Sequence, residues 1–200
     1  MIKRALTTRL PTRFGKFTLY AYENKENDVV HLALVKGDVH KSKSVLVRIH
    51  SECLTGDVFG SMRCDCGEQL EVALSAIQKE HNGILIYLRQ EGRGIGLNNK
   101  LRAYQLQDEG LDTVEANLKL GFNPDHRVYD AAVTIIEDLQ VSSIRLLTNN
   151  PKKLADFDGS GIQLVGRVPL QTKPNHENLK YLRTKRDRLG HILDITDLIT

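Results

Sequence analysis

The sequence lacks several features that mark common classes of protein. Tryptophan is absent from its 200 residues and aromatic side chains make up only 6%, which argues against a large surface for stacking nucleic-acid bases. The net charge is only +3, whereas nucleic-acid binders concentrate a larger positive excess on one face. Hydrophobic runs such as residues 84–88 are only strand-length, and no apolar signal segment follows the N-terminal charges. We therefore expect a soluble, cytoplasmic protein with no nucleic-acid or membrane partner.

Cysteine is also scarce, and its three copies are clustered. Cys53, Cys64 and Cys66 are the only cysteines in the chain. An odd number of cysteines cannot pair completely within one chain, and in a reducing compartment cysteines are more often metal ligands or catalytic groups than disulfides. Composition alone does not explain this clustering, so the segment is a candidate functional site.

Hydrophobic patterning predicts alternating strands and helices. With 40% apolar residues, the chain can form one domain with a buried core, or at most two small ones. The pattern predicts strands at residues 17–22, 29–35, 45–49, 84–88, 144–147 and 162–168. It predicts helices that begin near residues 67 and 151 and others at 97–107, 112–120, 128–139 and 177–188, with Asp112 and Asn150 as caps.

These elements predict an α/β fold. Strands alternate with helices over the last two-thirds of the chain, which indicates a partly parallel sheet. The N-terminal hairpin favours a mixed sheet over a purely parallel one. We therefore expect a single α/β domain over residues 1–200, with a mixed sheet, an N-terminal β-hairpin region, flanking helices and a flexible tail at about residues 194–200.

The cysteine spacing is typical of a metal site. Cys64 and Cys66 are two residues apart at an expected strand-to-helix junction, and Cys53 returns to them across a glycine-containing loop. Thiolates suit zinc, with Zn–S distances of roughly 2.3 Å. Three protein ligands would leave a fourth position for water, as in a catalytic site. The alternative is a closed structural site that His50 completes, while simple burial of the thiols fits less well because charged residues flank them.

The charge of such a site limits its chemistry. A zinc ion bound to three thiolates has a formal charge of −1, so it acidifies water less strongly than a three-histidine site. A nearby general acid or base would help, and Glu52 and His50 are the local candidates.

Three other segments place charged side chains in loops. Residues 89–96 combine glycines, arginines and a glutamate between an expected strand and an expected helix, an arrangement that suits the binding of an anion. The spacing of the glycines fits neither the dinucleotide fingerprint nor the P-loop, and a plain turn is the alternative. Residues 148–153 are a second candidate phosphate site or only a good helix start. Residues 121–127 bring an acid, an imidazole and a guanidinium together, although such loops most often lie on the surface.

These segments closely resemble GTP cyclohydrolase II, a family of the riboflavin pathway. Seven strings occur in the family's order between about residues 10 and 193, and they read RIHSECLTGD, CDCG, YLRQEGRGIGL, NKLRAY, DTVEAN, LLTNNPKK and RVPL. The resemblance implies hydrolysis of GTP to 2,5-diamino-6-(5-phosphoribosylamino)pyrimidin-4(3H)-one, formate and pyrophosphate. It also implies a homodimer, and the monofunctional form of the enzyme, since this chain is too short for the dihydroxybutanone-phosphate synthase domain that many relatives carry.

The resemblance assigns roles to individual positions. The three cysteines would bind one catalytic zinc ion per subunit, and Mg²⁺ would accompany the triphosphate of GTP. Asp125 would accept a proton, Arg127 would attack the α-phosphate, and Tyr104 would complete ring opening and formate release. The implied GTP contacts are Arg48, Ile49, His50, Ser51, Glu52, Gln69, Glu91, Gly92, Arg93, Thr113, Thr148 and Lys153.

Alternatives to this mechanism and function stay open at the level of sequence. A guanidinium pKa above roughly 12 makes Arg127 an awkward nucleophile, so Arg127 could instead stabilise phosphoryl charge while water attacks. A relative that stops at the formamide after one hydration is a second possibility, against which Tyr104 argues. The third is a non-enzymatic zinc module that binds a nucleotide or a protein.

Overall fold

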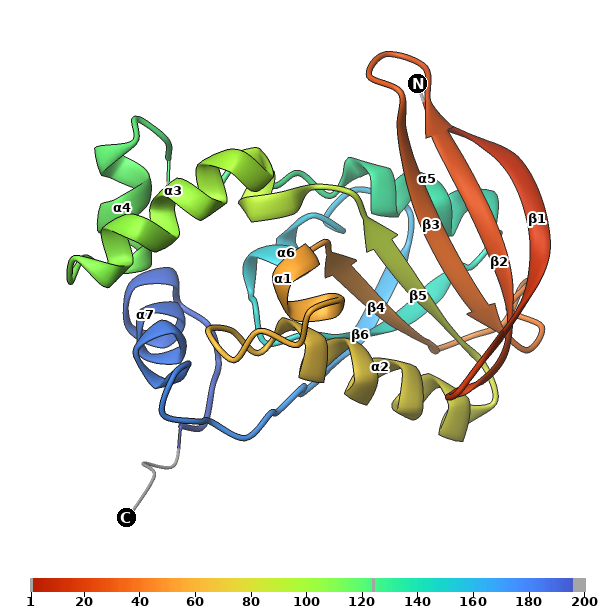
Figure 1. Ribbon diagram of the computed structural model, residues 1–200. Helices are drawn as coiled ribbons and strands as arrows, with labels where there is room; N and C mark the ends of the chain where they lie inside the picture. Colours follow the sequence, from red (N-terminus) through yellow and green to blue (C-terminus); the bar gives the residue numbers. More distant parts are fainter. Residues whose placement is uncertain (1, 124, 196–200) are drawn as a thin grey trace. The chain divides into compact units, whose positions relative to one another are not determined.

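The computed structural model describes residues 2–123 and 125–195. Its sheet has the strand order β1-β2-β3-β5-β4-β6-β7 (Figure 1). The strands are β1 (Ile2–Thr12), β2 (Gly15–Asn24), β3 (Val29–Lys36), β4 (Val45–Ser51), β5 (Gly83–Leu88), β6 (Ser143–Leu147) and β7 (Gln163–Val168). The helices are α1 (Leu54–Asp57), α2 (Cys66–Glu80), the 3₁₀ helix η1 (Glu91–Gly94), α3 (Gly96–Asp108), α4 (Thr113–Lys119), α5 (Asp130–Asp138), α6 (Lys152–Ala155) and α7 (Leu179–Leu189).

The sheet is mixed, as the sequence predicts. Strands β1, β2, β3 and β5 pair antiparallel in that order, whereas β4 and β7 each pair parallel with β6. The predicted hairpin is formed by β2 and β3, in which Asn24 faces Val29 across the turn. The mixed sheet, the N-terminal hairpin and the flanking helices confirm the predicted α/β fold class.

Most predicted elements are present, with shifts at their ends. Asp112 caps α4 in a full capping box with Glu115. The predicted cap of α6 is wrong by one residue, because the N-cap is Pro151, although the side chain of Asn150 still accepts the N–H of Lys152 at 3.0 Å. Strand β1 escapes prediction because most of its side chains are exposed, so it has no apolar alternation.

The core beside the sheet consists of two groups of buried side chains. The larger group joins β5 to α5 through residues such as Ile86 and Ile135, which are both 0% exposed. The smaller group contains Ala73, Leu74 and Ile77 of α2. These three residues share one face of the helix, as their spacing predicts. The mostly buried β5 leads into the glycine loop, and β4 leads into the first cysteine.

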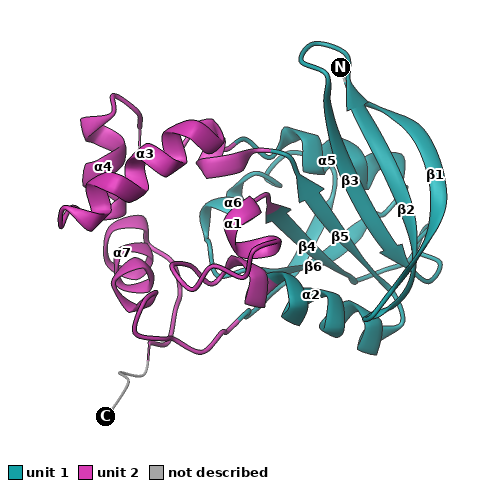
Figure 2. Ribbon diagram, in the orientation of Figure 1, with its two compact units in different colours: residues 1–50, 70–89, 128–170 teal, residues 51–69, 90–127, 171–200 magenta. Residues whose placement is uncertain are grey.

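Contacts divide the chain into two compact units (Figure 2). The first unit comprises residues 1–50, 70–89 and 128–170, and it contains the sheet. The second comprises residues 51–69, 90–127 and 171–200, and it contains the three cysteines together with α3, α4 and α7. The predicted single domain over residues 1–200 stays a prediction, and residues 196–200 of the expected tail lie outside the described residues.

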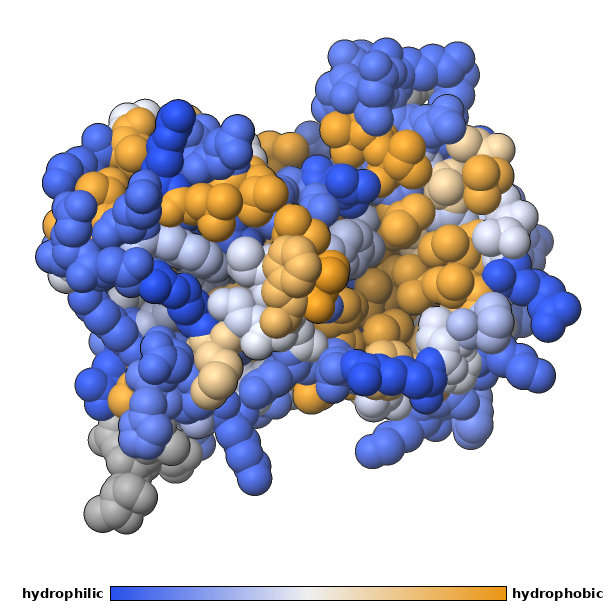
Figure 3. Space-filling model, in the orientation of Figure 1, coloured by the Kyte–Doolittle hydropathy of each residue, from blue (hydrophilic) through white to orange (hydrophobic). Residues whose placement is uncertain are grey.

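Apolar side chains remain visible on one face of the first unit. In Figure 3 they gather where Figure 1 shows β2, β3 and β5. Partly buried residues of these strands, such as Leu34 and Tyr87, pack against the smaller core group. Among the described residues, no helix is both long enough and apolar enough to cross a membrane.

Candidate metal centre and its cavity

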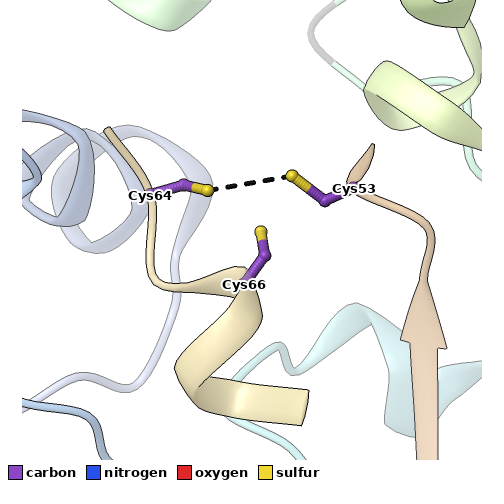
Figure 4. Close-up of side chains that lie close together, drawn as sticks. All are labelled: Cys53, Cys64 and Cys66. Carbon is purple, nitrogen blue, oxygen red and sulfur yellow. Dashed lines mark hydrogen bonds between the residues drawn. The ribbon is translucent and has the colours of Figure 1, made fainter. Parts of the chain in front are cut away.

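Three cysteine sulfur atoms converge in the second unit. Cys53 precedes α1, Cys64 lies in the turn before α2, and Cys66 is the first residue of α2. Figure 4 shows their thiols pointing toward one another. The three Sγ atoms lie within 4.8 Å of one another, and those of Cys53 and Cys64 are 3.7 Å apart. The predicted strand-to-helix junction at Cys64 is a turn-to-helix junction, because β4 ends before Cys53.

This spacing fits a metal ion. Tetrahedral coordination with Zn–S distances of ~2.3 Å places sulfur atoms ~3.8 Å apart. Among the described residues, no histidine or carboxylate joins the three cysteines in a common ligand group. The ring of His50, which the closed-site alternative requires as a ligand, stacks on Tyr87 with 5.4 Å between ring centroids. The cluster therefore has three candidate ligands and no fourth from the described part of the chain.

The backbone of Gly56 leaves room between the sulfur atoms. A Cβ atom on this buried residue would lie 2.9 Å from Sγ of Cys64, 3.0 Å from Cβ of Cys66 and 3.2 Å from Sγ of Cys53. Contacts this short force neighbouring atoms to move. Asp57 of the same short helix accepts the N–H of Cys53 at 3.0 Å, which fixes the backbone of that cysteine.

Replacing Gly56 with alanine should therefore weaken metal binding. The added methyl group pushes the sulfur atoms apart, and we expect metal affinity to fall about tenfold or more, equivalent to ~1.4 kcal/mol. Competition with a chromogenic chelator measures the affinity. The control is Gly166→Ala, because a Cβ atom at Gly166 meets nothing within 4 Å. Equal metal affinity in the two variants would contradict the proposed coordination.

One buried cation contacts the cluster. Nζ of Lys100 on α3 donates to Sγ of Cys53 at 3.2 Å and to Oε1 of Glu91 at 2.7 Å. The carboxylate of Glu91 also accepts the N–H groups of Leu54 and Gly92, both at 2.6 Å. Burial alone would lower the pKa of Lys100, but the thiolate of Cys53 and the carboxylate of Glu91 outweigh burial and raise it. Lys100 is therefore charged at neutral pH.

The thiols of the cluster differ in pKa. Hydrogen bonds from Cys64 and then from Cys66 lower the pKa of the Cys53 thiol, and the positive charge of Lys100 lowers it further. Hydrogen bonds with Cys53 and Cys64, together with burial, raise the pKa of Cys66. Cys53 is thus the thiol of the cluster whose pKa is lowered, and a metal ion that binds all three sulfur atoms as thiolates displaces their protons.

Tyr104 is linked to the cluster through a hydroxyl group that the sequence analysis did not single out. The phenol oxygen of Tyr104 lies 3.1 Å from Oγ1 of Thr55, which lies 3.7 Å from Sγ of Cys53. Lys100 and Tyr104 are four residues apart, so they share one face of α3. Burial raises the pKa of Tyr104, and its hydroxyl group is therefore protonated at neutral pH.

The cluster lines a cavity within the second unit. Other lining residues, to which the sequence assigns no role, are Arg63, Ile95, Lys100, Ala103, Gln107, Asn117 and Tyr181. The structure brings together in this cavity the predicted residues Ser51, Glu52, Cys53, Cys64, Cys66, Glu91, Gly92, Arg93, Tyr104, Thr113 and Arg127.

Arg63, Arg93 and Arg127 give the cavity positive charge. Arg127 is held by Asp125 through Nε–Oδ1 and Nη2–Oδ2 contacts of 2.8 and 2.5 Å. Burial would raise the pKa of Asp125, but the hydrogen bond and the charge of Arg127 lower it below its ordinary value. Arg93 has a buried Nη1 atom with no hydrogen-bond partner in the described part of the chain. A buried donor of this kind favours an anionic ligand.

The glycine loop uses several of its backbone amides internally. Gly92 donates to the side chain of Glu91 at 2.6 Å, and Gly94 donates to the carbonyl of Gln90 at 3.3 Å. Gly92 and Gly94 have φ values of +64° and +91°, which glycine adopts without steric cost. These glycines shape the turn, and the positive charge of this loop in the cavity comes from the side chain of Arg93.

A buried ion pair lies behind the cysteine turn. Asp65, between two of the cysteines, is 0% exposed and accepts Nζ of Lys185 and Nε2 of Gln69, each at 2.6 Å. Nζ of Lys185 also lies 4.5 Å from the ring centroid of Tyr181. Gln69, an implied GTP contact, is therefore bonded to Asp65. The string CDCG contains Asp65, but the charged terminal helix offers no pattern that singles out Lys185.

Five of the implied GTP contacts belong to the first unit and are buried there. Nζ of Lys153 donates to the carbonyl of Ile49 at 2.7 Å, and Nη1 of Arg48 donates to the carbonyl of Leu147 at 3.0 Å. These interactions connect the ends of β4 and β6 with α6. The five residues are Arg48, Ile49, His50, Thr148 and Lys153.

This fold and this cavity define an α/β protein in which candidate metal ligands and cations line one site. Residues 3–169 match the family model described as GTP cyclohydrolase II. The chain belongs to the GTP cyclohydrolase II family, as its motifs predict.

Relatives support the same membership. The chain is 54% identical to the riboflavin biosynthesis protein RibBA of Chlorobium phaeovibrioides over 193 residues. This alignment covers 96% of this chain and 47% of that protein. It is 55% identical over 195 residues to RibBA of Bacillus mycoides, with 98% and 49% covered. The chain thus spans about half the length of the curated relatives it matches. The chain is also similar to the crystal structure of RibBX, a two-domain 3,4-dihydroxy-2-butanone 4-phosphate synthase from A. baumannii. The alignment covers 86% of this chain and 40% of that one, with 21% sequence identity and a TM-score of 0.45. This likeness is too weak to inform the site.

Proposed function

We propose that the chain catalyses the zinc-dependent hydrolysis of GTP to the diaminopyrimidinone ribosyl phosphate, formate and pyrophosphate, the first step of riboflavin biosynthesis. The observation that carries this proposal is that the cysteine cluster and two arginines, Arg93 and Arg127, line the same cavity. GTP has a purine ring, on which a metal ion held by the cysteines would act, and a triphosphate, which the arginines would bind. Family membership supplies the substrate.

Cys53, Cys64 and Cys66 would hold the zinc ion. When bound, zinc supplies Lewis acidity that activates water for attack on the purine ring. The hydroxyl group of Tyr104, protonated because burial raises its pKa, is placed to donate a proton near the cluster and is hydrogen-bonded to Thr55. This position supports its implied part in ring opening and formate release.

At the phosphate end, two guanidinium groups would neutralise charge as pyrophosphate leaves. The bidentate pairing with Arg127 lowers the pKa of the Asp125 carboxyl group. Proton transfer from Arg127 to Asp125 is therefore unfavourable in this geometry, which favours charge stabilisation over covalent attack by Arg127. Mg²⁺ would accompany the triphosphate.

Other parts of the proposal rest on the family resemblance. The GTP contacts in the first unit stay predictions, as do the homodimer and the cytoplasmic location. The visible apolar side chains of the sheet (Figure 3) are a surface that a second copy would cover. Light scattering coupled to size-exclusion chromatography measures the mass of the assembly.

The proposal is tested by incubating the protein with GTP, Mg²⁺ and Zn²⁺. We expect formate, pyrophosphate and the diaminopyrimidine absorbance to appear together in equal amounts. A product that retains its formyl group would identify a relative that stops after one hydration. Nucleotide binding without turnover would favour the non-enzymatic module. Rapid quenching during turnover should trap no phosphoramidate on Arg127, and a trapped adduct would establish the covalent route.

A further inference from the structure

We propose that Lys100 is a positioning residue that controls how strongly Cys53 donates electrons to the metal ion. This inference rests on the metal centre of the proposed function. None of the roles implied by the resemblance falls on Lys100. Its ammonium group is the buried cation in direct contact with a sulfur atom of the cluster, at 3.2 Å from Sγ of Cys53.

The position of the ammonium group is fixed on two sides. The side chains of Lys100 and Glu91 are each only 10% exposed and meet at 2.7 Å. Glu91 is itself held by the N–H groups of Leu54 and Gly92. Leu54 follows Cys53 directly, so one carboxylate fixes both the lysine and the backbone next to its sulfur partner. Glu91, implied as a GTP contact, thus fixes the position of Lys100 relative to Cys53.

The contact changes the chemistry of the sulfur atom. Three thiolates and one divalent ion have a net charge of −1, which weakens the ion as a Lewis acid. A hydrogen bond from a cation withdraws electron density from the thiolate, and partners of this kind tune the metal. The contact is buried, so water screens the charge of Lys100 only weakly. Lys100 therefore makes the three-thiolate site more acidic than its ligand set alone allows.

The test uses cobalt(II) in place of zinc, because its sulfur-to-metal charge-transfer band reports the energy of the thiolate electrons. In Lys100→Met the band should move to lower energy, since the sulfur atom loses its hydrogen bond. Lys100→Arg should restore much of the original energy, and Lys100→Gln should lie between the two. The control is Lys119→Met, which removes the same charge from a lysine whose side chain is 59% exposed, and its band should not move.

Kinetics with zinc provide the second measurement. We expect kcat to fall about 10–100-fold in Lys100→Met, the usual range for partners of metal ligands, with a much smaller change in KM. A raised KM with an unchanged band would make Lys100 a substrate contact and overturn the inference. A lower Tm with an unchanged band would make it only a scaffold residue, with the same consequence. If Lys100→Met does not fold, the arginine and glutamine variants decide.

The outcomes also separate this inference from the proposed function. A band that shifts in a protein without GTP turnover would support the role of Lys100 and contradict the proposed reaction. A wild-type protein without any charge-transfer band would overturn the metal centre and the role of Lys100 together.

Discussion

Replacing Cys64 with serine should abolish formate release from GTP and leave a folded protein. The serine hydroxyl is a poor ligand for zinc, so only two thiolates would remain. We expect turnover to fall by about 1,000-fold or more, which corresponds to ~4 kcal/mol of lost transition-state stabilisation. Cys64 lies in a turn and belongs to neither core group beside the sheet. Metal content, formate release and thermal unfolding by circular dichroism measure the three parts of this prediction.

A matched control separates metal loss from disturbance of the loop. Met62→Ser changes a residue of the same turn that is 58% exposed, and it should retain both metal and activity. If Cys64→Ser unfolds the second unit instead, the metal has a structural role, because structural zinc contributes directly to folding. Unchanged turnover with full metal content would show that other residues bind the metal.

The second large effect is expected for Lys185→Met. This change leaves the carboxylate of Asp65, which is 0% exposed, without its cation at 2.6 Å. Removing one partner of a buried ion pair typically costs about 3–5 kcal/mol. Asp65 stands between Cys64 and Cys66, so metal affinity should fall as well. Urea unfolding and chelator competition measure the two effects separately.

Two comparisons make this prediction specific to the ion pair. Arg186→Met, on the same helix with a side chain that is 42% exposed, should cost no more than about 1 kcal/mol. The double variant Asp65→Asn with Lys185→Met should be more stable than Lys185→Met alone, because it leaves no buried charge. Equal stability of Lys185→Met and Arg186→Met would contradict the prediction.

The pH dependence of this contribution follows from the pKa of Lys185. Burial would lower that pKa, but the charge of Asp65 raises it above the ordinary value of 10.5. A raised pKa in the folded state means that the stabilisation is fully present below pH 10.5 and is lost as the pH rises through the folded-state value. The difference between the wild type and Lys185→Met should therefore persist at neutral pH and shrink only in strong alkali.

The sequence predicts those elements whose burial leaves a periodic pattern. Helix α2 is recognisable because Ala73, Leu74 and Ile77 bury one face, and β5 because it is apolar throughout. Strand β1 leaves no such pattern, since its stability comes from pairing with β2 and not from buried side chains. The short elements α1 and η1 depend on local turns, and a four-residue helix is too short to show a period.

The sequence likewise predicts some residues of the candidate site and misses others. The cysteines, Tyr104 and Arg127 are found from motifs, because each lies in a string of unusual residues. The contact of Lys100 with Cys53 joins positions 47 residues apart, and that of Lys185 with Asp65 joins positions 120 apart. Sequence patterns do not reveal which lysine is buried against which partner. One signal for Lys100 was available, since it lies one helical turn before Tyr104.

Helix α7 limits how far the chain can be shortened from its C-terminal end. The family model ends at residue 169, after the last strand and well after the cysteines. A chain shortened to that point would retain every residue that the family model matches. It would nevertheless lose Lys185, the cation beside Asp65, and Tyr181, which lines the cavity. The region that the family model matches therefore does not contain every residue that lines the cavity.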